Sequence, residues 1–95
     1  MAILATFEKQ PADVLDYDVD YTEWLPSGDA IDSVTHTVAP SDLEIQGAII
    51  VNGGTRVKLW VAGGENAKTY KVELTVTTTL GRVKQDEVRF RCKEY

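Results

Sequence analysis

Three aspartates at every second position, Asp16, Asp18 and Asp20, are the first residues whose spacing suggests chemistry. Carboxylate oxygens bind calcium, and a helix–loop–helix calcium loop that began at Asp16 would need Gly at position 6 and Glu at position 12. The chain has Tyr21 and Ser27 at those positions. On a β-strand the three carboxylates share one face at steps of about 6.8 Å, too far apart for one ion. The pattern therefore indicates a solvated strand face whose like charges oppose edge pairing.

Nucleophilic catalysis would have to use the single histidine, His36, with Cys92 or a hydroxyl of Ser33 or Thr35. Their spacing indicates no nucleophile and base pair. The sequence also contains no P-loop, G-x-S-x-G, H-E-x-x-H or dinucleotide motif. One cysteine forms no internal disulfide and no zinc pair. We therefore expect a protein that is not an enzyme and has no metal or cofactor, with Cys92 as a buried, reduced thiol.

Aromatic residues are the remaining candidates for binding, because Trp and Tyr serve as platforms for sugars and for protein partners. Tyr17 and Tyr21 share the phase of the apolar residues in their segment, so we expect them in the core. Trp24 stands beside a turn, and Trp60 lies on the basic side of its segment. We expect these two tryptophans to be partly exposed.

The charge of the chain is unevenly distributed along the sequence. Its net value is -5, the wrong sign for a general nucleic-acid binder. Residues 1–47 contain ten acids and one base, whereas residues 48–95 contain five acids and nine bases. Acidic and basic strands could lie side by side and pair. Alternatively, opposite faces carry opposite charge, and copies stack head to tail through unlike patches.

The elements that must position these side chains have the period of β-strands. Apolar and polar residues alternate in residues 14–22, 55–62, 68–78 and 86–94. Residues 30–38 alternate imperfectly, since Ile31 is out of phase with Val34, which predicts a bulge. Residues 43–51 begin with alternation and end as an apolar run, interrupted by Gly47. Turn residues separate these segments, at 24–29, 39–42, 52–54, 63–66 and 80–82.

The N-terminal segment, residues 1–13, is predicted as an extended arm of the domain in which a short first strand can form. Pro11 would end such a strand, because proline has no backbone donor. The first ten residues lack the features of a secretory signal.

The fold predicted from these segments is all-β. The 95 residues match one domain, 43% apolar and 26% charged residues are typical of a globular chain, and no apolar run approaches the roughly 20 residues of a membrane helix. Six or seven short strands predict an antiparallel, immunoglobulin-like β-sandwich over residues 1–95. A small barrel and a jelly roll remain as alternatives.

The stretch KQPADVLDYDVDYTEWLPSGDAI, residues 9–31, resembles the opening of a family of small tailed-phage and prophage virion proteins of the fiber-tail adaptor type. That opening reads about K-D-P-x-x-x-L-D-Y-x-x-D-W-x-x-W-L, then G-D-x-I. The matching residues are Lys9, Pro11, Leu15, Asp16, Tyr17, Asp20, Trp24, Leu25, Gly28, Asp29 and Ile31. The later W-L-x-G-G, Tyr-led strand and T-x-x-G-R turn are matched by Trp60, Gly63, Gly64, Tyr70, Thr78, Gly81 and Arg82. Gln10, Tyr21 and Val61 depart from the pattern.

The resemblance implies an immunoglobulin-like virion component, made in the bacterial cytoplasm, that binds other virion proteins of the neck, tail or fiber. It implies no catalysis and no cofactor, and we expect neither nucleic acid nor membrane as a partner. The alternative is a carbohydrate-binding sandwich that aids cell-surface attachment. A head-to-tail homo-oligomer would join acidic residues 14–32 to basic residues 82–93. The residues expected to contact partners are Trp24, Asp16, Asp18, Asp20, Arg89 and Arg91.

Overall fold

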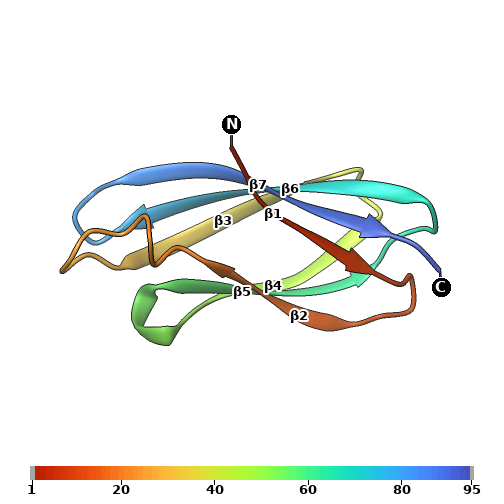
Figure 1. Cartoon of the computed structure of the whole chain (residues 1–95), viewed down its shortest axis with the longest axis horizontal. Helices are drawn as coiled ribbons and strands as arrows, with labels where there is room; N and C mark the ends of the chain where they lie inside the picture. The colour runs from red at the N-terminus through yellow and green to blue at the C-terminus, as the bar shows by residue number, and fades with distance from the viewer. Residues whose placement is uncertain (1, 95) are drawn as a thin grey trace.

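Two stacked β-sheets form the molecule in the computed structural model, which describes the backbone of residues 2–94 and the side chains of residues 5–94 (Figure 1). Met1 and Tyr95, the ends of the predicted 1–95 domain, lie outside the described residues. The strands are β1 (Ala2–Lys9), β2 (Leu15–Asp20), β3 (Ile31–Ala39), β4 (Leu43–Val51), β5 (Arg56–Gly63), β6 (Lys68–Thr78) and β7 (Val83–Cys92). A short 3₁₀ turn, η1 (Asn52–Gly54), joins β4 to β5. The predicted all-β sandwich of six to seven strands is confirmed.

The strand order identifies the topology. One sheet has the order β1-β7-β6-β3 and the other β2-β5-β4. If the strands are lettered A to G along the chain, the sheets are A-G-F-C and B-E-D, the immunoglobulin arrangement with its first strand moved to the larger sheet. In that place β1 pairs in parallel with β7, whereas the other pairs are antiparallel. Two separate sheets of seven described strands match neither a closed barrel nor an eight-stranded jelly roll.

The N-terminal segment adds an edge strand to the larger sheet. Residues 2–9, within the predicted extended segment, form β1 and pair with β7 from Asp86 to Cys92. Phe7 holds the strand there by packing its ring 5.1 Å from Tyr17 and 5.4 Å from Phe90. The structure thus contains a first strand within the predicted extended segment.

The core lies between the sheets and consists of the inward residues of both. Its most deeply buried apolar side chains, at 0% exposure, are Val57, Leu59, Val61, Tyr70, Val72, Leu74, Val76, Val88 and Phe90. Burial of each such side chain contributes about 1.5–3 kcal/mol. The predicted bulge is present, since the register of β3 against β6 shifts between Ile31 and Ser33. The alternation read from the sequence therefore specifies the buried face.

Strand β7 begins at Val83, three residues before the predicted segment 86–94. Its inward positions continue through Lys84 and Asp86, and the two side chains pair at 3.1 Å. Asp86 is 1% exposed. Charged residues at inward positions broke the apolar alternation, which is why the sequence alone placed the strand too late.

Lys9 is a buried lysine, 1% exposed, at the end of the sandwich where β1 turns into β2. Its ammonium group donates hydrogen bonds to the carbonyl oxygens of Gln10 (2.8 Å), Pro11 (3.4 Å) and Gly63 (2.7 Å). A buried charge is tolerated when such partners replace water. Lys9, at the end of β1 in the four-stranded sheet, is therefore tied to the end of β5 in the three-stranded sheet.

Tyr70 stabilises the same end of the sandwich through two hydrogen bonds of its hydroxyl. Its hydroxyl accepts a hydrogen bond from the Glu65 amide at 2.8 Å and donates one to Asp42 Oδ2 at 2.9 Å. A tyrosine near the start of strand F that bonds back to the preceding backbone is the tyrosine corner of immunoglobulin-like domains. Hydrogen bonding from Tyr70 is the main reason that the pKa of Asp42 lies below its usual value.

Candidate partner-binding surfaces

The three aspartates of β2 form one row on the outer face of the three-stranded sheet, here called the acid row (Asp16, Asp18 and Asp20). Lys58 lies 3.5 Å from Asp16, and Arg56 lies 3.9 Å from Asp18 and 3.5 Å from Asp20. Both bases belong to the neighbouring strand β5. Exposed pairs of this kind contribute about 0–1 kcal/mol each. The side-by-side arrangement of acidic and basic strands is thus present here.

The end of the acid row is further fixed by a local turn. The hydroxyl and the amide of Thr22 both donate to Asp20 Oδ1. The hydrogen bonds from the Thr22 hydroxyl and amide lower the pKa of Asp20. No group of three or more metal-binding side chains is arranged to hold an ion in the described part of the chain. The acid row is therefore a surface of carboxylates held in place by Lys58, Arg56 and Thr22.

The two arginines expected to meet a partner lie on the other outer face of the sandwich. Arg89 and Arg91 occupy outward positions of β7 in the four-stranded sheet. Arg89 Nε donates to Glu87 Oε2, and this bond is the main cause of the lowered pKa of Glu87. Arg91 stands opposite Glu8 in the register of β1. The fold therefore does not bring these arginines to the acid row within one molecule.

Trp24 lies at the end of the sandwich formed by the β2–β3 and β6–β7 loops. The guanidinium of Arg82 stands 4.4 Å from the centre of its ring, and the ammonium of Lys84 stands 5.6 Å away. Tyr21 packs edge-on at 6.2 Å. Trp24 is half-buried by these contacts, as expected for a partly exposed residue.

Trp60 lies elsewhere, on the outer face of the three-stranded sheet opposite Asp16, and is 38% exposed. It is separated from the loop end by the length of β2, about 13 Å for the four residues from Asp16 to Asp20. The fold therefore does not join the two tryptophans into one aromatic platform of the kind a sugar would use.

Asp29 holds the two loops of that end together. Its Oδ1 accepts hydrogen bonds from the Ala30 amide (2.9 Å), the Thr79 hydroxyl (3.0 Å) and the Leu80 amide (3.2 Å). Burial raises the pKa of Asp29, but the hydrogen bonds from hydroxyl and amide groups outweigh it, so the pKa lies below its usual value. The carboxylate thus fixes the β6–β7 turn against the β2–β3 loop.

The β6–β7 turn and the first residue of β7 carry the two most exposed large apolar side chains among the described residues, Leu80 at 67% and Val83 at 65%. Together with Trp24, Arg82 and Lys84 they form a surface that we call the loop tip. Sequence reasoning missed Leu80 and Val83. The available signal was two large apolar residues on either side of Gly81-Arg82, within a predicted turn.

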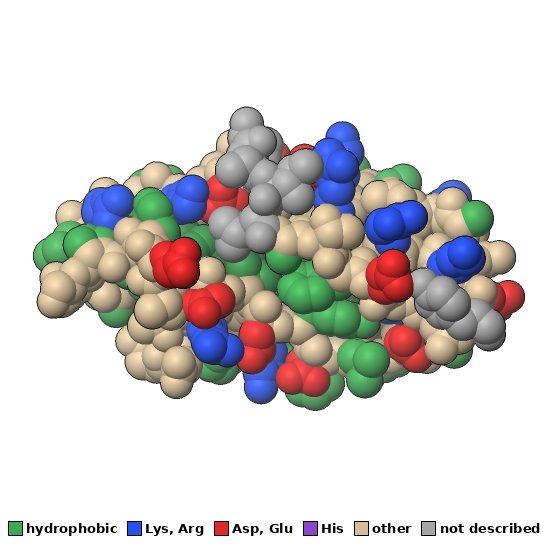
Figure 2. All heavy atoms as spheres, in the orientation of Figure 1, with side chains coloured by type: hydrophobic (Ala, Val, Ile, Leu, Met, Phe, Trp, Pro, Cys, Tyr) green, Lys and Arg blue, Asp and Glu red, His purple; other side chains and the backbone are tan. Residues whose placement is uncertain are grey.

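A groove of about 450 Å³ opens between β1 and β2 on the side of the sandwich. Its lining residues are Ala5, Phe7, Asp18, Val19, Asp20, Tyr21, Glu23 and Trp24. Figure 2 shows apolar side chains in the opening between the two sheets and acidic side chains along the lower sheet. The Tyr21 hydroxyl is buried and has no hydrogen-bond partner among the described residues. The groove is thus apolar at its base and acidic along one rim.

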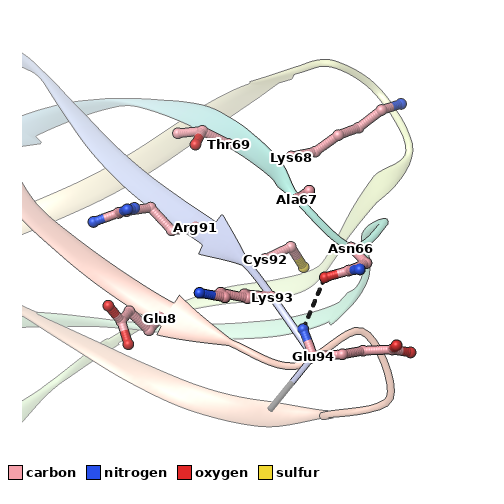
Figure 3. A pocket seen from close by; sticks show the side chains of 9 residues that line it. All are labelled: Glu8, Asn66, Ala67, Lys68, Thr69, Arg91, Cys92, Lys93 and Glu94. Carbon is pink, nitrogen blue, oxygen red and sulfur yellow. Dashed lines mark hydrogen bonds between the residues drawn. The ribbon is translucent and has the colours of Figure 1, made fainter.

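A second hollow, of about 440 Å³, lies where β6 begins and β7 ends (Figure 3). Side chains of both charges line it, and the Glu94 amide donates to Asn66 Oδ1 across it at 2.9 Å. Cys92 faces inward here, with its sulfur 3.8 Å from the Gly63 carbonyl oxygen. Burial is the main cause that raises the pKa of this thiol. At neutral pH the thiol is protonated, the form that is not nucleophilic.

Comparison with known families gives one result. The family model described as podophage GP4 fiber-tail adaptor protein gp77 matches residues 9–91. The matched range contains Lys9, the acid row, the loop tip and both outward arginines of β7. A search of curated proteins finds no match.

Proposed function

Because the chain belongs to the podophage GP4 fiber-tail adaptor family, we propose that it is a non-enzymatic virion adaptor that joins a tail protein to a fiber protein. Its family role is that of a phage structural component. An adaptor must present at least two separate contact surfaces. The loop tip and the β1–β2 groove share only Trp24, and they differ in chemistry.

The loop tip is the observation that carries this proposal. Leu80 and Val83 are exposed at 67% and 65%, and Asp29 accepts hydrogen bonds from Thr79 and Leu80 in the adjoining turn. Exposed apolar side chains on a rigid turn lose little conformational freedom on binding, which favours affinity. Trp and Arg are the residue types that dominate binding energy at protein interfaces, and both are present in Trp24 and Arg82.

The chemistry of the tip also indicates what it binds. Arg82 and Lys84 surround the Trp24 ring, so a partner surface there would be apolar with acidic groups around it. In immunoglobulin-like domains the B–C and F–G loops at one end form the binding site of antibodies. The β2–β3 and β6–β7 loops hold the corresponding places in this sandwich.

Capture of the tail and fiber proteins encoded beside this chain tests the proposal. Replacing Leu80 and Val83 together by Ser should lower capture of one partner by about tenfold or more. The matched control is Ile49→Ser, because Ile49 is 48% exposed but lies on β4, away from the tip. Equal capture by the double variant and the control would refute the tip as the contact.

Contact between copies is the other arrangement that the surfaces allow, with the acid row of one copy against Arg89 and Arg91 of the next. Charge reversal of both arginines would then lower the mass measured by light scattering at low salt. An unchanged mass would refute the head-to-tail contact. The adaptor role would then be tested only through the Leu80 and Val83 variant.

A further inference from the structure

We propose that the free edge of β2 and the adjoining groove bind an extended segment of another virion protein, in which Lys or Arg alternates with apolar residues. The inference rests on the proposed adaptor role only for the source of that segment. It concerns a surface that shares only Trp24 with the loop tip, and it calls for a basic partner where the tip calls for an acidic one.

The first argument is the unpartnered backbone of two strands. Strand β2 is an edge of the three-stranded sheet, and β1 is an edge of the four-stranded sheet. The two strands border the same groove without pairing with each other. Outer backbone groups of an edge strand are a template for strand addition, in which main-chain hydrogen bonds supply affinity and alternate side chains supply specificity.

The inward side chains of β2 are incompletely covered. Leu15 has the inward phase but is 48% exposed, and Tyr17 is only half-buried, whereas their partners Val61 and Leu59 in β5 are 0% exposed. The groove beside them is lined by Phe7 and other apolar groups. An added strand would place its apolar residues over these side chains, since residues two apart share a face.

The outward side chains of the added strand would meet the acid row. Asp16, Asp18 and Asp20 repeat every second residue, the same period as the outward positions of a strand lying about 4.8 Å away. Lys58 and Arg56 contact the row from the β5 side, and three carboxylates face these two bases. Glu23 adds a further acid to the groove lining, which holds no basic residue. Lys or Arg at alternate positions therefore matches the row in both charge and spacing.

The base of the groove contains a further unused polar group. Tyr21 is 1% exposed and lines the groove, yet its hydroxyl has no hydrogen-bond partner in the described part of the chain. Burial and then the carboxylate of Asp86 raise the pKa of this hydroxyl, so it stays protonated beneath the groove.

A second copy of the chain is not the occupant. Pairing of β2 with β2 would set aspartates against aspartates, and like charges opposite each other are destabilising. Two stretches of this chain alternate basic and apolar residues, Arg56-Val57-Lys58-Leu59 in β5 and Arg89-Phe90-Arg91-Cys92 in β7. Both strands are already paired on both sides, β5 with β2 and β4, and β7 with β1 and β6. The segment must therefore come from a different protein.

The test uses the full chain and three blocked synthetic octapeptides at about 50 mM salt, followed by backbone amide NMR. One peptide alternates Lys and Val, one has the same residues in two blocks, and one alternates Glu and Val. We expect the alternating Lys–Val peptide to shift the amides of residues 15–20 and Phe7, and to bind about tenfold more tightly than the other two. Equal binding of the block peptide, shifts confined to another surface, or no binding would each overturn the proposal.

A charge variant and its matched control complete the test. The triple substitution D16N, D18N and D20N should weaken binding of the Lys–Val peptide by about tenfold. The control removes three acids from strands of the four-stranded sheet, as D32N, E73Q and E87Q, and should leave the affinity unchanged. Unchanged affinity in the acid-row variant, with its native amide spectrum retained, would refute the inference. Loss of partner capture in the Leu80 and Val83 variant is a separate result, so failure of the groove and failure of the adaptor role are distinguishable.

Discussion

Each end of the sandwich contains a buried charged side chain that is hydrogen-bonded to a distant segment, but the two ends present different surfaces to solvent. At one end the buried ammonium of Lys9 donates to carbonyl oxygens of Gln10 and Gly63 at 2.8 and 2.7 Å. At the other, the carboxylate of Asp29 accepts from Thr79 and Leu80 at 3.0 and 3.2 Å. Each charge is hydrogen-bonded to a group from a segment far apart in the sequence. Each therefore fixes one connection against another.

The difference lies in what the fixed segments present to solvent. Around Lys9, the Tyr70–Asp42 hydrogen bond closes the corner further. Around Asp29, the held turn projects Leu80 and Val83 at 67% and 65% exposure. A buried charge with backbone partners thus indicates a rigid connection, and only the side chains beside it decide whether that connection is structural or binding. Four measurements test this distinction.

The largest effect on stability is expected at the Lys9 end. Lys9→Met keeps the volume of the side chain but leaves the carbonyls of Gln10 and Gly63 without their donor. Each buried unsatisfied group costs about 1–3 kcal/mol, so the free energy of unfolding should fall by about 3 kcal/mol. Urea unfolding measures it. A loss below about 1 kcal/mol would mean that Lys9 does not hold the corner.

Tyr70→Phe should cost about 1–2 kcal/mol, because it removes one hydroxyl that bonds both Asp42 and the Glu65 amide. Tyr17→Phe is the matched control, since the Tyr17 hydroxyl is buried without a hydrogen-bond partner among the described residues. That control should change the free energy of unfolding by no more than about 0.5 kcal/mol. Equal losses in the two variants would show that the Tyr70 hydroxyl has no special role.

Lowering the pH should reduce the stability that the carboxylates at both ends contribute. The pKa values of Asp29 and Asp42 are lowered in the fold, so the unfolded chain binds protons more readily. The resulting stability is fully present above the unfolded pKa of about 3.9 and is lost as the pH falls through the lower folded values. Asp29→Asn and Asp42→Asn should each reduce the fall in the urea midpoint between pH 5 and pH 3. If the urea midpoint of either variant fell as steeply with pH as that of the parent chain, the replaced aspartate would not be a source of the acid sensitivity.

The smallest effect on stability is expected at the exposed side chains of the tip. Leu80→Ser with Val83→Ser should change the free energy of unfolding by less than about 0.5 kcal/mol, because these side chains are largely solvated. The same variant should lose partner capture. A marked loss of stability would instead assign these two side chains to the packing of the end.

The strands predicted from the sequence agree best with the structure where apolar and polar residues alternate without interruption. The strand predicted over residues 68–78 is β6, with those limits, and the phase defect at Ile31 is a bulge. The prediction of strand limits failed where the inward side chains are charged and not apolar. Lys84 and Asp86 are inward residues of β7, and their charges concealed its start. Trp24, the acid row and the arginines of β7 were named correctly as outward or half-exposed, but their neighbours were not foreseen.

The sequence by itself determined the all-β class, the spacing of the acid row and the family to which the chain belongs, because alternation and motif order are local properties. Only the tertiary structure decided which charges are buried and which turn is held rigid. Lys9 meets Gly63 across 54 positions of sequence, and Asp29 meets Thr79 across 50. Such contacts depend on how two sheets stack, and no pattern within one strand records that arrangement.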